Sequence, residues 1–333
     1  MRVLVTGAGG FIGSHLTETL LKKGYEVRAF TYYNSMNSAE WIDTFDEQTR
    51  QKIDIVAGDV RDLSFVQRVM ENCDAVLHLA ALIGIPYSYS NPESYIDTNV
   101  KGTMNIMEAA RMHGVKRVVH TSTSEVYGSA KFVPITEAHP LQGQSPYSAS
   151  KIGADQMAYA YATSFDLPVV TVRPFNTFGP RQSLRAVIPT VITQLLQGDE
   201  IIKIGATTPT RDFSHVSDTV KGFIAALESD NNKIHGETIN LGSQFEISIS
   251  EVIELIANIF EKNVKVENDA QRFRPESSEV QRLYADNTKA KAMLDWTPCF
   301  AGKEGFIRAL KHTVQWYSEP EHLRCLRIQD YVI

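Results

Sequence analysis

Over its first 175 residues the chain alternates short apolar segments with longer amphipathic ones, and this alternation constrains the fold more than any other feature. The apolar segments predict strands at residues 2–6, 26–31, 54–57, 75–79, 117–121 and 168–173. Helices are predicted between them, including 12–23 and 96–113, and a glycine follows each of these two, as is common just past a helix end. This order of elements predicts an α/β fold, a doubly wound parallel sheet joined by right-handed crossovers.

The turn after the first predicted strand is rich in glycine and reads TGAGGFIG at residues 6–13. Glycines permit a tight turn and let the backbone approach a pyrophosphate, while the following helix supplies free N–H groups and a positive dipole end. The turn therefore predicts dinucleotide binding; the alternative is a strand–helix turn that binds no ligand.

Two further positions bear on how a dinucleotide would be bound at this turn. An acidic residue that ends the second strand commonly binds the adenosine ribose of NAD, but this strand ends in FTYYN at residues 30–34. No arginine is present there to hold a 2′-phosphate, so the choice between NAD and NADP stays open. Asp59 follows the third strand, where it is either an acceptor for the adenine amino group or a solvated loop carboxylate.

Two groups further along the chain carry acid–base chemistry. Residues 121–128, TSTSEVYG, follow an apolar strand, and hydroxyls at that end of a parallel sheet face the ligand crevice. Tyr147 and Lys151 share one helix face, and an ammonium beside a phenol lowers the phenol pKa, which makes a phenolate base accessible. Taken alone, the hydroxyl cluster can be explained as a turn, and the Tyr147–Lys151 pair as part of an amphipathic helix. The two groups together with the glycine turn predict an active site.

After residue 178 the alternation weakens. Helical periodicity continues at 187–197, and Ser248 with Glu251 forms a capping box that predicts the start of another helix. We expect a dinucleotide-binding domain over residues 1–178 and a smaller, mainly substrate-binding domain over residues 179–333, some segments of which return to the sheet. The tail after Ser318 carries no interpretable pattern.

Composition excludes several classes of protein. The net charge is −6 with lysines and arginines scattered, which argues against binding to nucleic acid or to an anionic membrane. No apolar run approaches the roughly 18 residues of a membrane span, and the N-terminus leads into a strand and not a signal peptide. The three cysteines are too far apart for a disulfide framework or a zinc site. A soluble cytoplasmic protein is expected.

Taken together, these motifs resemble the extended short-chain dehydrogenase/reductases that act on nucleotide sugars. The resemblance covers nearly the whole chain and includes HLAA at residues 78–81 and RPFNTFGPR at residues 173–181. It implies a Rossmann fold, hydride transfer by Thr123, Tyr147 and Lys151, and NAD as cofactor, with NADP not excluded. The residues it assigns to cofactor binding are Gly7, Gly10, Phe11, Ile12, Gly13, Asp59, Val60, Leu79, Ala80, Ala81, Asn99, Thr121, Tyr147 and Lys151.

Within this family, the Thr123-Ser124-Glu125 stretch resembles sugar-nucleotide 4,6-dehydratases and nucleotide-sugar decarboxylases. Sugar 4-epimerases usually carry a small apolar residue where Glu125 stands. The surroundings of Tyr147 and residues 186–189 and 211–216 look like the dehydratases, and most of all like the NAD-dependent enzymes of legionaminic-acid-type nonulosonic acid pathways. The implied reaction converts a UDP- or GDP-linked N-acetylglucosamine to its 4-keto-6-deoxy derivative. The alternatives are a nucleotide-uronic acid decarboxylase, a 4-epimerase and, more distantly, a non-catalytic regulator that senses a dinucleotide.

The resemblance also implies roles for individual residues. Tyr147 takes the proton of the 4-hydroxyl as hydride leaves C4, and Glu125 then removes the C5 proton before water leaves from C6. Dehydratases with an aspartic acid at the position of Ser124 use it to protonate the leaving hydroxyl, and a serine is too weak an acid for this step. The proton then comes either from protonated Glu125 or from water through a relay by Ser124, and we favour Glu125. The helices predicted over 96–113 and 147–165 resemble those of a homodimer interface. Substrate contacts are expected from Asn176, Arg185, Val187, Arg211 and Arg274.

Overall fold

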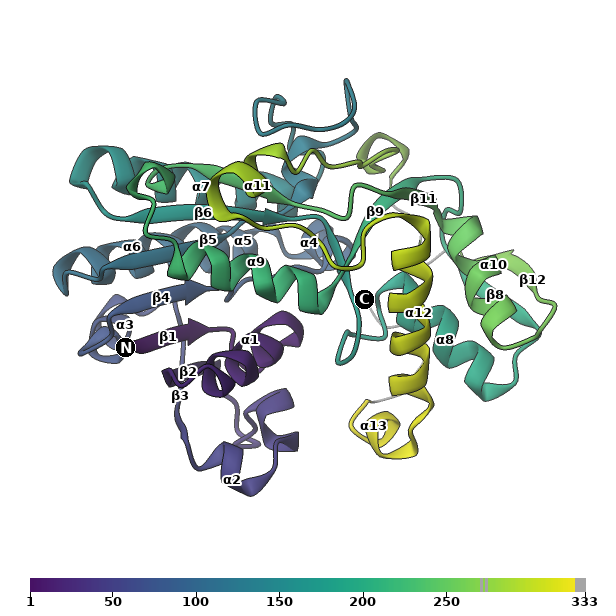
Figure 1. The fold of residues 1–333 in the computed structure, drawn as a ribbon, viewed down its shortest axis with the longest axis horizontal. Coiled ribbons are helices and arrows are strands. Elements are labelled where there is room, and N and C mark those ends of the chain that lie inside the picture. Colours follow the sequence, from purple (N-terminus) through teal and green to yellow (C-terminus); the bar gives the residue numbers. More distant parts are fainter. Residues whose placement is uncertain (270–271, 273–274, 327–333) are drawn as a thin grey trace.

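The computed structural model describes residues 1–269, 272 and 275–326, and its largest element is a seven-stranded parallel sheet (Figure 1). The strand order is β10-β6-β5-β4-β1-β2-β3, so the first six strands have the doubly wound order and the fold prediction is confirmed. All six predicted strands are present. The seven strands are β1 (Arg2–Thr6), β2 (Glu26–Tyr32), β3 (Ile53–Gly58), β4 (Ala75–His78), β5 (Arg117–Thr121), β6 (Val169–Pro174) and β10 (Thr238–Leu241).

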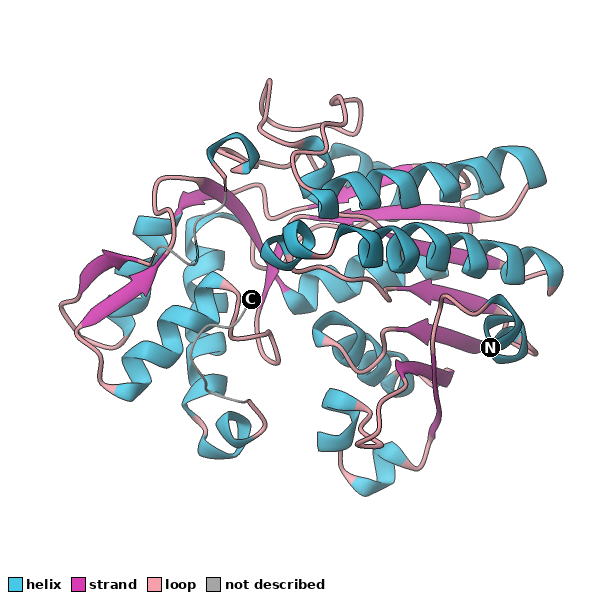
Figure 2. Ribbon diagram, turned by 180° about the vertical axis from the view of Figure 1, so that it is seen from behind, coloured by secondary structure: helices cyan, strands magenta, loops and turns pink. Residues whose placement is uncertain are grey.

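Helices cover both faces of this sheet. Because side chains alternate along a strand, Val3 and Val5 of β1 enter one apolar core while Leu4 enters the other. Figure 1 shows α1 and α9 in front of the sheet, and Figure 2, seen from behind, shows helices over the opposite face. The helices of the two layers are α1 (Phe11–Lys22), α9 (Val216–Glu228) and α11 (Thr288–Leu294) on the first face, and α3 (Leu63–Met70), α6 (Gly102–Met112) and α7 (Pro146–Phe165) on the second.

The helix predicted over 96–113 differs from a single α-helix. Residues 96–101 are π-helical, and this segment joins α6 without a break. The short helix α5 (Pro92–Tyr95) precedes it, and Gly114, with φ of 62°, ends α6 as expected. π-helical turns inside α-helices frequently occur at functional sites, and this one contains Asn99.

A smaller unit lies beyond the carboxyl ends of the sheet strands, around α8, α10 and α12 in Figure 1. It contains two small sheets, with strand orders β11-β9-β7 and β12-β8, and an apolar core of its own. The predicted capping box opens α10: the Ser248 hydroxyl accepts from the Glu251 N–H at 3.2 Å, and the Glu251 carboxylate accepts from the Ser248 N–H at 3.0 Å. Its strands are β7 (Asn176–Phe178), β8 (Ile201–Ile204), β9 (Thr210–His215), β11 (Glu246–Ser248) and β12 (Lys265–Asn268), and its helices are α8 (Val187–Gln197), α10 (Ile249–Ile259), α12 (Gly302–Ser318) and α13 (Pro320–Arg324).

The chain passes between the two units more than once. β7 lies in the smaller unit, whereas α9, β10 and α11, which come later in the chain, pack on or within the large sheet. Among the described residues, no helix combines the length and apolarity that crossing a membrane requires. The remaining elements are η1 (Glu40–Thr44), α2 (Glu47–Arg50), α4 (Ile85–Ser90), η3 (Ser124–Tyr127), η4 (Asn232–Ile234) and η6 (Glu276–Ser278).

Candidate active site

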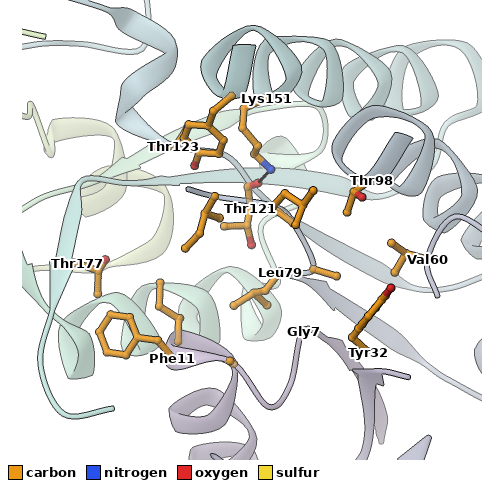
Figure 3. Close-up of a pocket in the computed structure, with 18 of the residues that line it drawn as sticks. Gly7, Phe11, Tyr32, Val60, Leu79, Thr98, Thr121, Thr123, Lys151 and Thr177 are labelled. Carbon is orange, nitrogen blue, oxygen red and sulfur yellow. Dashed lines mark hydrogen bonds between the residues drawn. The ribbon is translucent and has the colours of Figure 1, made fainter. Parts of the chain in front are cut away.

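A cavity of about 800 Å³ opens at the carboxyl ends of the sheet strands (Figure 3). The glycine turn forms one wall, and its shape requires glycine: a Cβ on Gly13 would lie 2.1 Å from the Gly7 carbonyl oxygen, and Gly7 has a φ of 67°. Such a wall leaves room for a ligand to approach the backbone at the start of α1. The predicted cofactor residues that line the cavity are Gly7, Gly10, Phe11, Ile12, Gly13, Asp59, Val60, Leu79, Ala80, Ala81, Thr121, Tyr147 and Lys151.

The wall after β4 is held by Thr6, a residue that the sequence interpretation did not single out. Its hydroxyl accepts hydrogen bonds from the backbone N–H groups of Leu79 and Ala80, at 3.1 and 3.0 Å. The same hydroxyl lies 2.8 Å from Nδ1 of His78, so its own proton is directed to that nitrogen. Burial keeps the pKa of His78 well below its usual value, so the ring is neutral and accepts this bond.

Asn99 is not among the residues that line the cavity, although cofactor binding was predicted for it. Its side chain is 1% exposed and lies behind the wall. The amide Nδ2 donates to the Leu82 carbonyl oxygen and to the Ser150 hydroxyl, both at 2.9 Å, while Oδ1 accepts from the Leu82 N–H at 2.8 Å. Asn99 therefore positions Leu82, which does line the cavity.

The predicted catalytic residues meet at the end of β5. Thr123, Ser124, Glu125, Tyr147 and Lys151 all line the cavity, the first three on the turn into η3 and the last two on α7. A capping box fixes the start of α7 and so the direction of Tyr147, because the Ser145 hydroxyl accepts from the Ser148 N–H and the Ser148 hydroxyl accepts from the Ser145 N–H. Ser124, Glu125 and Tyr147 are buried apart from their contact with the cavity.

The electrostatics of Tyr147 differ from the sequence prediction. Burial raises the pKa of the phenol, the neighbouring Glu125 carboxylate raises it further, and a hydrogen bond from Thr123 lowers it. Lys151 is not among the main influences on this pKa, and its ammonium donates to the Thr121 carbonyl oxygen at 2.7 Å (Figure 3). Burial also lowers the pKa of Lys151 to about 8. The expectation of a depressed phenol pKa is therefore wrong for this structure, since loss of water outweighs the nearby cation.

A buried polar network lies behind α7 and was not found from the sequence. Asp155, one helical turn after Lys151, accepts from Arg173 at 2.7 Å, from the Ser122 hydroxyl at 2.5 Å and from His120 at 3.0 Å. Burial opposes ionisation of Asp155, but the bond to His120 and the charge of Arg173 hold its pKa well below the usual range. These bonds tie α7 to β5 and β6 beneath the catalytic residues. The four-residue spacing of Lys151 and Asp155, which places both on one helix face, was the sequence feature that could have revealed this network.

Asp59 lines the cavity, but its carboxylate is already engaged. The Arg61 Nε donates to both Asp59 oxygens, at 3.0 and 2.9 Å, and Nη2 adds a bond of 2.5 Å. The hydrogen bonds from Arg61 lower the pKa of Asp59. Arg61 also lines the cavity, and the sequence interpretation did not include it.

The predicted substrate residues separate into two groups. Asn176 lines the cavity, and its Oδ1 is buried with no hydrogen-bond partner in the described part of the chain. Gln182, which was not predicted, has the same two properties at Oε1. Buried acceptors without donors carry a cost that a bound ligand can remove, so both oxygens are candidate contacts for a polar ligand.

The other predicted substrate residues that the structure describes, Val187 and two arginines, do not line the cavity. Arg211 is buried and donates to the Glu279 carboxylate at 2.9 Å and to the Thr210 carbonyl oxygen at 3.0 Å. Arg185 is exposed, and Val187 begins α8 just outside the lining. Arg274 lies outside the described residues.

Comparisons with known proteins agree with this geometry. The GDP-mannose 4,6 dehydratase family model matches residues 4–308. The UDP-N-acetyl-alpha-D-glucosaminuronate decarboxylase of Bacillus cytotoxicus is 34% identical, over 96% of this chain and 99% of that protein. The solved dTDP-glucose 4,6-dehydratase DesIV of Streptomyces venezuelae, with NAD and TYD bound, is 30% identical with a TM-score of 0.83, over 97% and 98% of the two chains. The UDP-glucuronic acid 4-epimerase of Bacillus cereus, with UDP-glucuronic acid and NAD, is 29% identical with a TM-score of 0.84, over 95% and 98%. The chain therefore belongs to the GDP-mannose 4,6-dehydratase family, among the extended short-chain dehydrogenase/reductases that modify nucleotide sugars.

Proposed function

We propose that this protein is an NAD-dependent nucleotide-sugar 4,6-dehydratase that converts a nucleotide-linked N-acetylglucosamine to its 4-keto-6-deoxy derivative. The observation that carries the proposal is a second acid–base group beside the hydride-transfer residues. Glu125 shares the cavity with Thr123 and Tyr147 and lies close enough to raise the pKa of Tyr147. Oxidation at C4 needs one base, so an additional carboxylate points to a further proton transfer on the same sugar.

The cavity fits the cofactor that its solved relatives hold. The glycine turn leaves no room for a Cβ at Gly13 and offers the N-terminus of α1 to a pyrophosphate. Near the catalytic residues, the Thr121 hydroxyl is buried without a partner in the described part of the chain, so it can bond a polar ligand. The chemistry that NAD supplies is reversible acceptance of a hydride. We assign its binding to residues 7–13, to the wall that Thr6 supports and to Lys151.

Tyr147 is the proposed base for the 4-hydroxyl. Its raised pKa means that the phenolate needs stabilisation, and Thr123 already provides one hydrogen bond. Lys151 provides a charge one turn along α7, and its lowered pKa lets the ammonium exchange protons near neutral pH. Thr123 and Tyr147 would both bond the oxygen at C4, which holds the sugar with its C4 hydrogen directed away from them.

Glu125 is the proposed base for C5. The ketone formed at C4 acidifies the C5 hydrogen, so a carboxylate is strong enough to remove it. The C6–O bond then breaks, and the proton held by Glu125 leaves with the hydroxide as water. The hydride removed from C4 would return to C6 while a proton adds to C5, which gives the 4-keto-6-deoxy sugar. Ser124 is buried beside Glu125 and is too weak an acid to replace it in this step.

A decarboxylase acting on a nucleotide uronic acid is the second candidate, since one relative with 34% identity carries that activity in its name. The wall beside Tyr147 favours the dehydratase. Ile85 and Leu82 pack in one apolar cluster with Tyr147, and all three line the cavity. An apolar wall suits the methyl groups of an N-acetylated 6-deoxy sugar better than it suits a carboxylate. A 4-epimerase leaves Glu125 without a task.

One assay separates these activities. The purified protein is incubated with UDP- and GDP-linked N-acetylglucosamine and with the corresponding 6-carboxylates, and products are identified by NMR. A 4-keto-6-deoxy sugar supports the proposal. Carbon dioxide from a uronate, or a 4-epimer, identifies one of the alternatives and contradicts it.

Assembly as a homodimer and a cytoplasmic location remain predictions. The helices predicted to form the interface expose several large apolar side chains in this single chain: Ile96, Met112, Tyr159 and Phe165. The molar mass in solution would test the first prediction directly.

A further inference from the structure

The loop that follows β2 brings a carboxylate over the glycine turn. Glu40, at the start of η1, lines the cavity. A Cβ built on Gly9 would lie 2.9 Å from the Glu40 Cβ and 3.1 Å from its carboxylate oxygen Oε2, so this side chain rests against the turn. The next residue, Trp41, donates its N–H to the Gly9 carbonyl oxygen at 3.1 Å and fixes η1 to the same place.

This placement is built into the loop. The Asn34 side chain makes four hydrogen bonds within residues 32–38, two as donor and two as acceptor. The Asp43 carboxylate accepts from the Ser38 hydroxyl at 2.9 Å and from the Ala39 N–H at 2.7 Å. The turn before Glu40 is therefore held from both sides.

Glu40 itself is held in an unfavourable conformation. Its φ is 56°, in the left-handed region that residues with a Cβ avoid, and such strain tends to persist where function requires it. Within the described part of the chain, no hydrogen bond satisfies its carboxylate. Partial burial and the nearby Asp43 raise the pKa of Glu40, as expected for a carboxylate that lacks donors.

We propose that Glu40 takes the place of the acidic residue absent from the end of β2, accepting hydrogen bonds from the adenosine ribose hydroxyls and excluding a 2′-phosphate, so that the protein selects NAD over NADP. The inference rests on the dinucleotide binding proposed above. In doubly wound folds the ribose lies near the end of the second strand, beside the glycine turn. β2 ends here at Tyr32, which is exposed, and Glu40 reaches the same corner from the following loop.

Arg61 is the cation in this part of the described lining that could attract a 2′-phosphate instead. Its guanidinium is already bonded to both oxygens of Asp59, so the pair carries no net charge. The unpaired charge facing a 2′-phosphate is then that of Glu40, which repels a phosphate and attracts hydroxyl donors.

Binding of NAD and of NADP to the full-length protein, freed of any co-purified dinucleotide, tests the proposal by isothermal titration calorimetry. We expect the wild type to bind NAD at least tenfold more tightly than NADP. Glu40→Gln should reduce that ratio at least tenfold, through weaker NAD binding, stronger NADP binding or both. Glu40→Gly removes the carboxylate while relieving the positive φ, so it should fold and show the same loss. Glu47→Gln removes an equal charge from an exposed position on α2, outside the lining, and should leave the ratio unchanged.

Each remaining outcome overturns a different statement. A Glu40→Gln protein with the wild-type ratio refutes the role of Glu40 and leaves the dehydratase proposal standing. A wild type that prefers NADP refutes both the role of Glu40 and the NAD dependence proposed above, and leaves only the 4,6-dehydratase chemistry standing. A wild type that binds neither dinucleotide refutes both. Equal losses in Glu40→Gln and Glu47→Gln would assign the preference to overall charge and not to this carboxylate.

Discussion

Replacing Glu125 with glutamine should stop the proposed reaction between its first and second steps. The substitution keeps the side-chain shape in a position that is only 8% exposed, but removes the base for C5. Loss of a general base costs about 10²–10⁴ in rate, or about 3–5 kcal/mol in the barrier, so 6-deoxy product should form that much more slowly. The first step should survive, because the charge of Glu125 raises the pKa of Tyr147 and its removal lowers that pKa.

The assay is a stopped-flow measurement of reduced nicotinamide absorbance after substrate is added, combined with NMR detection of deuterium at C5. Glu125→Gln should accumulate the reduced cofactor without incorporating deuterium. Glu93→Gln, an exposed carboxylate on α5, is the control for loss of charge and should behave like the wild type. Product at the normal rate from Glu125→Gln would refute the elimination mechanism. Absence of reduced cofactor despite substrate binding would mean that Glu125 acts before C4 oxidation.

Three further predictions follow from the same geometry. Tyr147→Phe should lower turnover by about 10²–10⁴ while NAD affinity in calorimetry stays within a few-fold, and near-normal turnover would exclude Tyr147 as the base. Asn99→Ala leaves the Leu82 N–H and carbonyl without their partner and should reduce the free energy of unfolding by about 2–4 kcal/mol in urea titrations; a loss below about 1 kcal/mol would contradict its positioning role. Because burial lowers the pKa of Lys151 to about 8, its ammonium is lost as pH rises through that value, and kcat/KM should fall there. Lys151→Arg stays protonated and should move the fall to higher pH; an unchanged profile would assign it to another group.

The amino-acid order alone determined the large sheet and the location of the site. Strand and helix periodicity is a local property, so the segments that became β1 to β6 could be recognised without knowledge of their neighbours. The glycine turn is local too, because only glycine tolerates the 2.1 Å approach at Gly13. Parallel strands place their carboxyl ends at one edge, which is why Thr123 and Tyr147 could be expected to meet.

Only the tertiary structure decided what each polar side chain bonds to. Arg211 is paired with Glu279 and Asn99 with Leu82, and in neither case does the sequence separation reveal the partner. The pKa values of Tyr147 and Lys151 depend on how much water the fold removes from them, and this burial outweighs the effect of their four-residue spacing on α7. Glu40 reaches the glycine turn through a loop whose path is set by side-chain hydrogen bonds to its backbone, and such bonds have no periodicity that a sequence pattern can reveal.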